Sequence, residues 1–103
     1  MSNILDKEHE KLEGLDYGDA LLKLKQGHAL SRKGWNGKGM FVYYVPESKY
    51  KAQTGVAKQF FGEEALVPYN PYLAIKNVDN TVSTWVASIN DQLATDWFVV
   101  KLR

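Results

Sequence analysis

The sequence predicts a small α+β domain: a mainly antiparallel sheet of about five strands, with an N-terminal helix and a short helix before the last strand. Three observations predict this class. An apolar stripe at helical spacing follows Asp16, several short β-branched and aromatic runs come later, and turn residues separate those runs. At 103 residues the chain suits one core. We expect an N-terminal extension over 1–15 and a single domain over 16–103.

Composition excludes several classes of protein. The chain has no cysteine, which excludes disulfides and thiolate nucleophiles and fits a cytosolic protein. It shows no apolar run long enough for a membrane span and no signal-peptide pattern. The net charge of +1 hides an acidic start, because residues 1–16 carry five acids against two lysines. The mildly basic remainder favours a small anion and falls short of a nucleic-acid binder.

The first predicted element is a helix that begins at Asp16, its N-cap, and ends near Gln26. Gly27 then suits the left-handed position after a helix. The stripe at helical spacing should enter the core, and three charged residues should face water. The stripe comprises Tyr17, Ala20, Leu21 and Leu24; the charged residues are Asp19, Lys23 and Lys25.

The chain is organised around residues 32–44. A short strand over 28–32 leads into a loop with three glycines, and a β-branched and aromatic strand follows over 40–45. Trp35 and two lysines lie in this loop, and Phe41 and Tyr43 alternate on the strand after it. Such a stretch can hold a ligand, although a Trp beside a glycine turn can equally plug the core.

Residues 46–66 are the least regular part of the body. We interpret them as an insertion over one face, with a short helix within 56–65 that points Phe60 and Phe61 into the body. Residues 67–71 contain two prolines and read as a rigid connector.

The last part of the chain predicts a hairpin, a short helix and a final strand. Strands over 72–76 and 81–86 flank a turn at 77–80. Ser88 is the expected N-cap of the short helix, with Asp91 three residues later as in a capping box. The final strand is expected over 97–102, with Trp97 in the core.

Binding groups outnumber catalytic ones. Flat aromatic faces, amides and hydroxyls, and cations are what a nucleotide requires, although a core of aromatics under a polar surface would look the same. The aromatic candidates are Trp35, Phe41, Tyr43, Tyr69 and Trp85; the polar ones are Asn36, Asn70, Ser88 and Asn90; the cations are Arg32, Lys33 and Lys38.

The sequence supplies no catalytic set. It has no HExxH, GxSxG or P-loop motif, and its glycine loop precedes a strand, whereas a dinucleotide-binding turn follows one. Asp91 and Asp96 flank the short helix and suit a helix-end role better than acid–base catalysis. His28 stands without a second histidine nearby, so we expect no metal site, no catalytic residue and no cofactor.

Several motifs stand out along the chain: RKGWNGKGM at 32–40, the segments 19–27 and 70–73, Trp85 with Ser88, and LATDW at 93–97. Together they resemble the Thoeris anti-defence 2 family of phage and prophage proteins. The resemblance covers about residues 16–100, and its strongest signature is the run at 32–40.

This resemblance implies a non-enzymatic sponge in the cytoplasm of the host bacterium. It implies sequestration of cyclic ADP-ribose isomers made by Thoeris immunity, with cyclic di- or trinucleotides held at separate sites by some relatives. It also implies a homo-oligomer, commonly a tetramer, with pockets between subunits. By the same resemblance Trp35, Asn36, Gly37 and Phe41 form one wall, Trp85 stacks, and hydrogen bonds come from Ser88, Asn90 and Asp91.

Our hypothesis is therefore an oligomeric protein that binds a cyclic nucleotide immune signal, most simply a glycocyclic ADP-ribose. The rivals are a phosphodiesterase-like enzyme on the same ligands and a protein-interaction module that uses residues 1–15 and 46–66. Binding to a nucleic-acid polymer and to membranes is not expected. The predicted binding residues are Arg32, Trp35, Asn36, Gly37, Lys38, Phe41, Tyr43, Asn70, Trp85, Ser88, Asn90 and Asp91.

Overall fold

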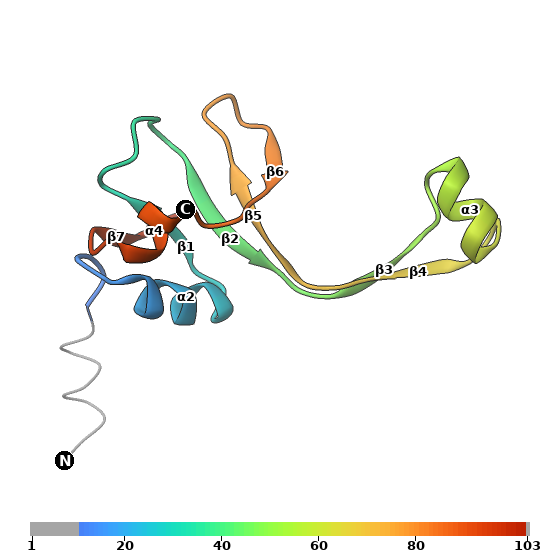
Figure 1. The fold of residues 1–103 in the computed structure, drawn as a ribbon, viewed down its shortest axis with the longest axis horizontal. Helices are drawn as coiled ribbons and strands as arrows, with labels where there is room; N and C mark the ends of the chain where they lie inside the picture. The colour runs from blue at the N-terminus through green and yellow to red at the C-terminus, as the bar shows by residue number, and fades with distance from the viewer. Residues whose placement is uncertain (1–10, 103) are drawn as a thin grey trace, which may run out of the picture.

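The protein consists of a two-layer body and a long arm that projects from it (Figure 1). The structure is a computed structural model and describes residues 11–102. In chain order the elements are α2 (Tyr17–Lys25), β1 (Ala29–Arg32), β2 (Phe41–Val45), β3 (Ser48–Lys51), α3 (Gly55–Phe61), β4 (Leu66–Tyr69), β5 (Tyr72–Lys76), β6 (Val82–Thr84), α4 (Ile89–Leu93) and β7 (Trp97–Val100).

The body is built on a five-stranded sheet in the order β6-β5-β2-β1-β7, and every neighbouring pair is antiparallel. α2 packs against β1, β2 and β7, and α4 packs on α2. This arrangement confirms the predicted α+β class, the mainly antiparallel sheet of five strands and both predicted helices. The ends of these five strands differ from the sequence expectation by at most two residues, which is the usual uncertainty of element boundaries.

Helix α2 begins and ends as the sequence predicts. The Asp16 side chain accepts a hydrogen bond from the Asp19 N–H at 2.8 Å, and Gly27 adopts a φ of 99° after the helix. Asp19 and Lys25 are exposed as expected, but the prediction for Lys23 is wrong, because this residue is only 8% exposed. Lys23 lies three positions after the buried Ala20, so its aliphatic stem packs beside the buried stripe.

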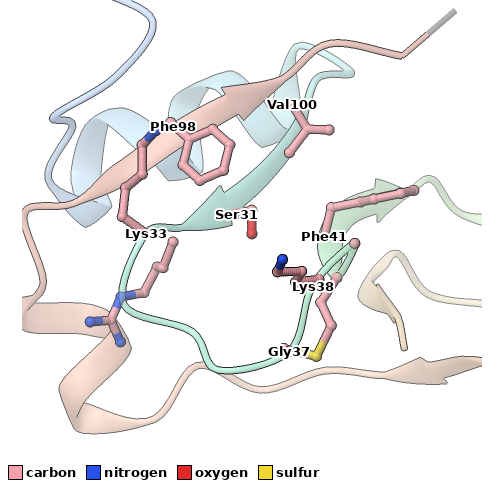
Figure 2. A pocket seen from close by; sticks show the side chains of 10 residues that line it. Ser31, Lys33, Gly37, Lys38, Phe41, Phe98 and Val100 are labelled. Carbon is pink, nitrogen blue, oxygen red and sulfur yellow. The ribbon is translucent and has the colours of Figure 1, made fainter. Parts of the chain in front are cut away.

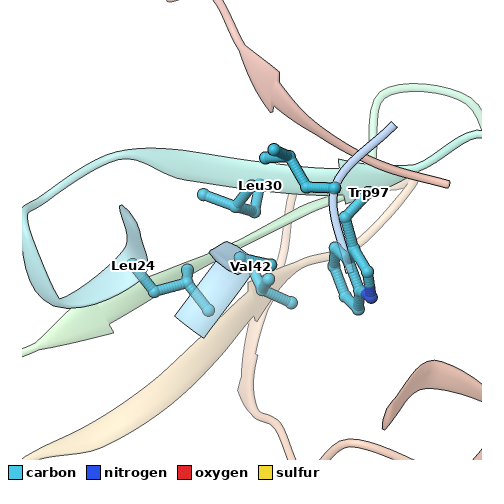
Figure 3. Packing of buried hydrophobic residues seen from close by; sticks show 6 residues of the cluster. Leu24, Leu30, Val42 and Trp97 are labelled. Atoms are coloured by element: carbon cyan, nitrogen blue, oxygen red, sulfur yellow. The ribbon is translucent and has the colours of Figure 1, made fainter. Parts of the chain in front are cut away.

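The core lies between α2 and the sheet (Figure 3). Its largest fully buried side chains are Leu24, Leu30, Val42 and Trp97, so the predicted core role of Trp97 is confirmed. Leu15 is also buried, and its backbone exchanges hydrogen bonds of 2.9 and 3.1 Å with Trp97. The segment just before α2 therefore adds an edge contact to β7. Residues 1–10 of the predicted extension lie outside the described residues.

Residues 46–66, predicted as an insertion over one face of the body, instead belong to the arm. β3 and β4 form a separate antiparallel ribbon that continues away from β2 and β5, and α3 caps its far end (Figure 1). The molecule consequently extends over 54 Å along its longest axis. The prediction that Phe60 and Phe61 point into the body is wrong, since both are exposed at the tip. Residues 67–71 are not a connector either, because β4 includes Pro68.

Pro68 is tolerated in β4 because this strand lies at the edge of a two-stranded ribbon, where a missing N–H costs little.

The later predictions for 72–97 are confirmed. β5 and β6 flank the expected turn, in which the Asn77 N–H donates to the Thr81 carbonyl at 2.8 Å. α4 begins with the full capping box predicted for Ser88 and Asp91.

Candidate functional site

A cluster of charges holds the glycine loop to α4. The Arg32 Nε atom donates to Asp96 Oδ1 at 2.8 Å, and Arg32 Nη1 donates to Asp91 Oδ1 at 2.9 Å. Asp96 also accepts the Gly34 N–H at 2.8 Å. The sheet register makes this possible, because Arg32 pairs with Trp97 and so lies beside Asp96. We call Arg32, Asp91 and Asp96 the Arg32 cluster.

The two carboxylates of the cluster are held ionised. Burial alone would raise the pKa of Asp91, but hydrogen bonds from Trp35, Arg32 and Ser88 outweigh it, and the pKa is lowered. The hydrogen bond from Arg32 is the main reason why the pKa of Asp96 is lowered. In turn, the hydrogen bond to Asp96 raises the pKa of the Arg32 guanidinium against the effect of burial. The guanidinium is therefore already bound to two anions.

The aromatic residues Trp35, Trp85 and Trp97 pack together with Tyr17. The ring centroids of Trp35 lie 6.2 Å from those of Trp85 and 5.4 Å from those of Trp97, in edge-to-face geometry. The indole Nε1 of Trp35 donates to Asp91 Oδ1 at 3.0 Å, and that of Trp97 donates to the Asp91 carbonyl at 2.9 Å. Trp35 and Trp85 thus cover one end of the core, and each retains partial exposure.

A pocket of about 310 Å³ opens on the other face of the sheet, under the glycine loop (Figure 2). Alternation along the strands places Ser31 and Phe98, which pair in register, on the face opposite the core. We call this cavity the loop pocket. Its lining comes from the end of β1, the loop, the start of β2 and β7: Ser31, Arg32, Lys33, Gly37, Lys38, Gly39, Met40, Phe41, Phe98 and Val100.

The loop pocket combines aromatic walls with cations. Lys33 Nζ lies 4.7 Å from the centroid of the Phe98 ring, and Lys33 has only a loose, exposed ion pair with Glu13, at 3.9 Å. Lys38 is exposed and forms no ion pair within residues 11–102. Phe41 stands on the opposite side of the pocket from Phe98 (Figure 2). A flat ring beside a phosphate would meet apolar walls and two ammonium groups here.

The structure divides the predicted binding residues into separate groups. Four line the loop pocket, four belong to or adjoin the Arg32 cluster, and four lie elsewhere. The first group is Arg32, Gly37, Lys38 and Phe41; the second is Trp35, Trp85, Ser88 and Asp91; the third is Asn36, Tyr43, Asn70 and Asn90.

The third group does not converge. Tyr43 lines a neighbouring pocket of about 330 Å³ that it shares with Phe41 and Lys76. Asn70 lines another, of about 300 Å³, at the base of the arm. Asn36 and Asn90 are exposed on the loop and on α4. Their binding roles stay predictions, as do those of the other residues.

Sequence reasoning missed Phe98 and Val100 as pocket residues. Strand alternation offered the signal, because a core role for Trp97 and Val99 sends Phe98 and Val100 to the opposite face. Within the described residues, no group of three or more His, Cys, Asp or Glu side chains could hold a metal ion. Among residues 11–102 there is likewise no helix with the length and hydropathy that a bilayer crossing requires.

Comparison with known proteins shows the family to which the chain is similar. A profile of the Thoeris anti-defense 2-like domain matches residues 15–100. The chain belongs to the Thoeris anti-defense 2-like family. The chain is also similar to a protein named Thoeris anti-defense 2 from Bacillus phage SP01, with 39% identity over 87 residues that cover 84% of this chain and 94% of the relative.

Membership of the Thoeris anti-defense 2-like family supports an anti-defence role. The resemblance described from the sequence motifs is thereby confirmed at the level of the family. The matched range includes the Arg32 cluster, the loop pocket and the whole arm.

Proposed function

We propose that this protein blocks Thoeris-type immunity by binding a cyclic nucleotide signal and withholding it, without cleavage. A glycocyclic ADP-ribose is the proposed ligand, and cyclic di- or trinucleotides are a second ligand class for a separate site. We further propose that the chain acts as a homo-oligomer, a tetramer built from dimers. Family membership supports the anti-defence role, and the loop pocket supports the ligand.

The single observation that carries the ligand assignment is the pairing of aromatic rings with exposed lysines in the loop pocket. Phe41 and Phe98 supply apolar surface for a base or ribose, while Lys33 and Lys38 supply charge for a pyrophosphate. Arg32 lines the same pocket, but its guanidinium is bound to Asp91 and Asp96. The two lysines should therefore dominate phosphate binding.

The size of the loop pocket favours a shared site. Small-molecule pockets usually span about 300–1,000 Å³, so one chain's 310 Å³ lies at the lower limit. A cyclic ADP-ribose, which carries a base, two riboses and a pyrophosphate, would fill the pocket and extend beyond its rim. A second copy of the chain would then enclose the exposed part, in keeping with the proposed oligomer.

Isothermal titration with glycocyclic ADP-ribose isomers tests this proposal. We expect the wild-type chain to bind one isomer, and Lys38→Ala and Lys33→Ala each to weaken binding about tenfold, since each removes one charge-assisted contact. Lys25→Ala is the matched control, because this exposed lysine lies on α2, away from the pocket.

The ligand should also be recovered intact by chromatography after the complex is denatured. Recovery of a linear product would move the function to a phosphodiesterase-like enzyme. Equal affinities for the Lys25, Lys33 and Lys38 variants would remove the loop pocket from the proposal. Absence of heat with every isomer would lead next to cyclic oligonucleotides as the first ligand class.

A further inference from the structure

The arm makes few packing contacts with the body. Within the described residues, β3 and β4 pair only with each other, and α3 packs on β4. An isolated two-stranded ribbon is marginally stable in water, and so is a helix of seven residues. An extended arm of this kind gains stability when another surface packs against it.

The end of the arm presents apolar side chains to water. Val56 and Phe60 are one helical turn apart, and Phe60 is 80% exposed. Phe61 lies edge-on to Phe60 with ring centroids 4.8 Å apart, and Leu66 follows at the start of β4. We call Val56, Phe60, Phe61 and Leu66 the arm tip. Exposed aromatic pairs of this kind mark interaction surfaces.

A second apolar surface lies on the body at α4. Ile89 and Leu93 are one turn apart on this helix and both are exposed, and Val86, just before the helix, is 88% exposed. We call these three residues the α4 patch. The one charged side chain of α4, Asp91, is buried and bound to Arg32. An apolar partner can therefore cover the α4 patch without burying an unpaired charge.

We infer that the arm tip of one copy packs on the α4 patch of a second copy, and that the contact is reciprocal. This inference rests on the proposed self-association and names the surfaces that produce it. The arm can reach because the eight residues from Pro46 to Gln53 span about 26 Å when extended. Its own body is beyond its reach, because the ribbon points away from it (Figure 1).

The apolar area of the two surfaces favours the reciprocal contact over a contact between two arm tips. From the side chains involved and their exposure, the arm tip and the α4 patch each present roughly 400 Å² of apolar surface. Two tips packed on each other would bury about 400 Å² per copy, half of the roughly 800 Å² typical of a stable interface. Reciprocal exchange buries both surfaces on both copies and reaches that area.

Symmetry also favours the reciprocal contact. A one-way contact leaves one tip and one patch free on a pair of molecules, so further copies add until a ring closes or an open chain forms. A two-fold exchange uses each surface once and closes. The pair so formed is the dimer from which the proposed tetramer would be built.

Sedimentation velocity of the full chain without ligand, at about 20 µM, tests the inference. We expect the wild type to sediment as a multiple of the 11.7 kDa chain. Phe60→Lys and Leu93→Glu should each lower the average mass at least about twofold, because each buries a charge in an apolar contact. Val78→Glu, an exposed position on the β5–β6 turn, is the matched control and should keep the wild-type mass.

Mixing the Phe60→Lys and Leu93→Glu chains should restore the larger species, since one exchanged contact becomes wild-type and the other pairs a lysine with a glutamate. A Leu93→Glu chain that stays associated while Phe60→Lys dissociates would overturn the inference in favour of contact between tips. A monomeric wild type would overturn the self-association and this inference together. Loss of oligomer by Val78→Glu would also overturn it. Ligand titration of the same variants reports separately on the proposed function.

Discussion

At the scale of single residues, Asp91 connects more of the molecule than any local pattern suggests. Its carboxylate accepts hydrogen bonds from Arg32, Trp35 and the Ser88 N–H, and its backbone carbonyl accepts the Trp97 indole. The capping box explains only the contact with Ser88. The charge of Asp91 also holds the glycine loop against α4, so we regard it as structural in the described chain.

The lowered pKa values of Asp91 and Asp96 predict a fall in stability at acidic pH. Their ordinary value is 3.8, and the unfolded chain binds more protons wherever the folded pKa is lower. The contribution of the Arg32 cluster is therefore complete above about pH 5 and is lost as pH falls through 3.8 and the lower folded values.

Urea unfolding between pH 3 and 7 measures this effect. Asp96→Asn should reduce the free energy of unfolding by about 1–2 kcal/mol at pH 7, where the partly exposed ion pair is formed, and should flatten the dependence below pH 5. The same acid slope in the variant and the wild type would contradict this explanation.

At the scale of elements, the glycine loop is positioned by close contacts that leave no room for side chains. A Cβ atom at Gly34 would lie 2.8 Å from Asp96 Oδ2, which already binds Arg32 and the Gly34 N–H. Gly39 adopts a φ of 79°, which glycine accommodates without strain. The glycines thus bring the loop backbone to Asp96 and turn it into β2.

Gly34→Ala should lower the free energy of unfolding by about 1–2 kcal/mol, because the added methyl group displaces Asp96 from the loop. Gly55→Ala is the control: this position opens α3 and has no atom within 4 Å of the added Cβ, so the variant should be as stable as the wild type or slightly more so. Thermal unfolding of the three proteins checks this. A Gly34→Ala midpoint equal to that of the wild type would show that Asp96 moves freely.

The sequence predicts these elements well where the signal is local. Asp16, Ser88 and Asp91 are caps whose partners lie three residues away, and their helices begin where expected. The arm could not be predicted in this way, because Phe60 and Phe61 look like core residues in any local window. Whether such residues turn inward depends on the direction of the ribbon, which the non-local pairing of β2 with β5 decides.

The residues of the candidate site could likewise be predicted only where they are close to one another in the sequence. Lys38 and Phe41 could be predicted because loop and strand are adjacent in the sequence. Phe98 enters the same pocket from a strand about 60 positions later, through its pairing with Ser31. The sequence also suggested that Arg32 is available to a ligand, because its partners Asp91 and Asp96 lie 59 and 64 positions later in the chain.

At the scale of the whole molecule, the body and the arm are separable. The core cluster contains no residue of 46–71, and Val45 and Tyr72 face each other in register where the arm leaves the sheet. Replacing 46–71 by Asn-Gly would close β2 and β5 as a two-residue hairpin.

The chain without its arm should unfold cooperatively, with a midpoint that does not depend on concentration. The full chain's midpoint should rise with concentration, because association stabilises the folded state. Calorimetry at two concentrations of each protein separates the cases. Loss of cooperative unfolding in the shortened chain would show that the arm is part of the folding unit.

The Arg32 cluster also has a consequence for the order of folding. Its ion pairs join residues 59 and 64 positions apart, and closing so long a loop is entropically costly. They require β7 to be paired with β1, so we expect them to form late in folding. We therefore expect the cluster to slow the unfolding of the native chain more than it speeds folding, and so to lengthen the lifetime of the folded molecule.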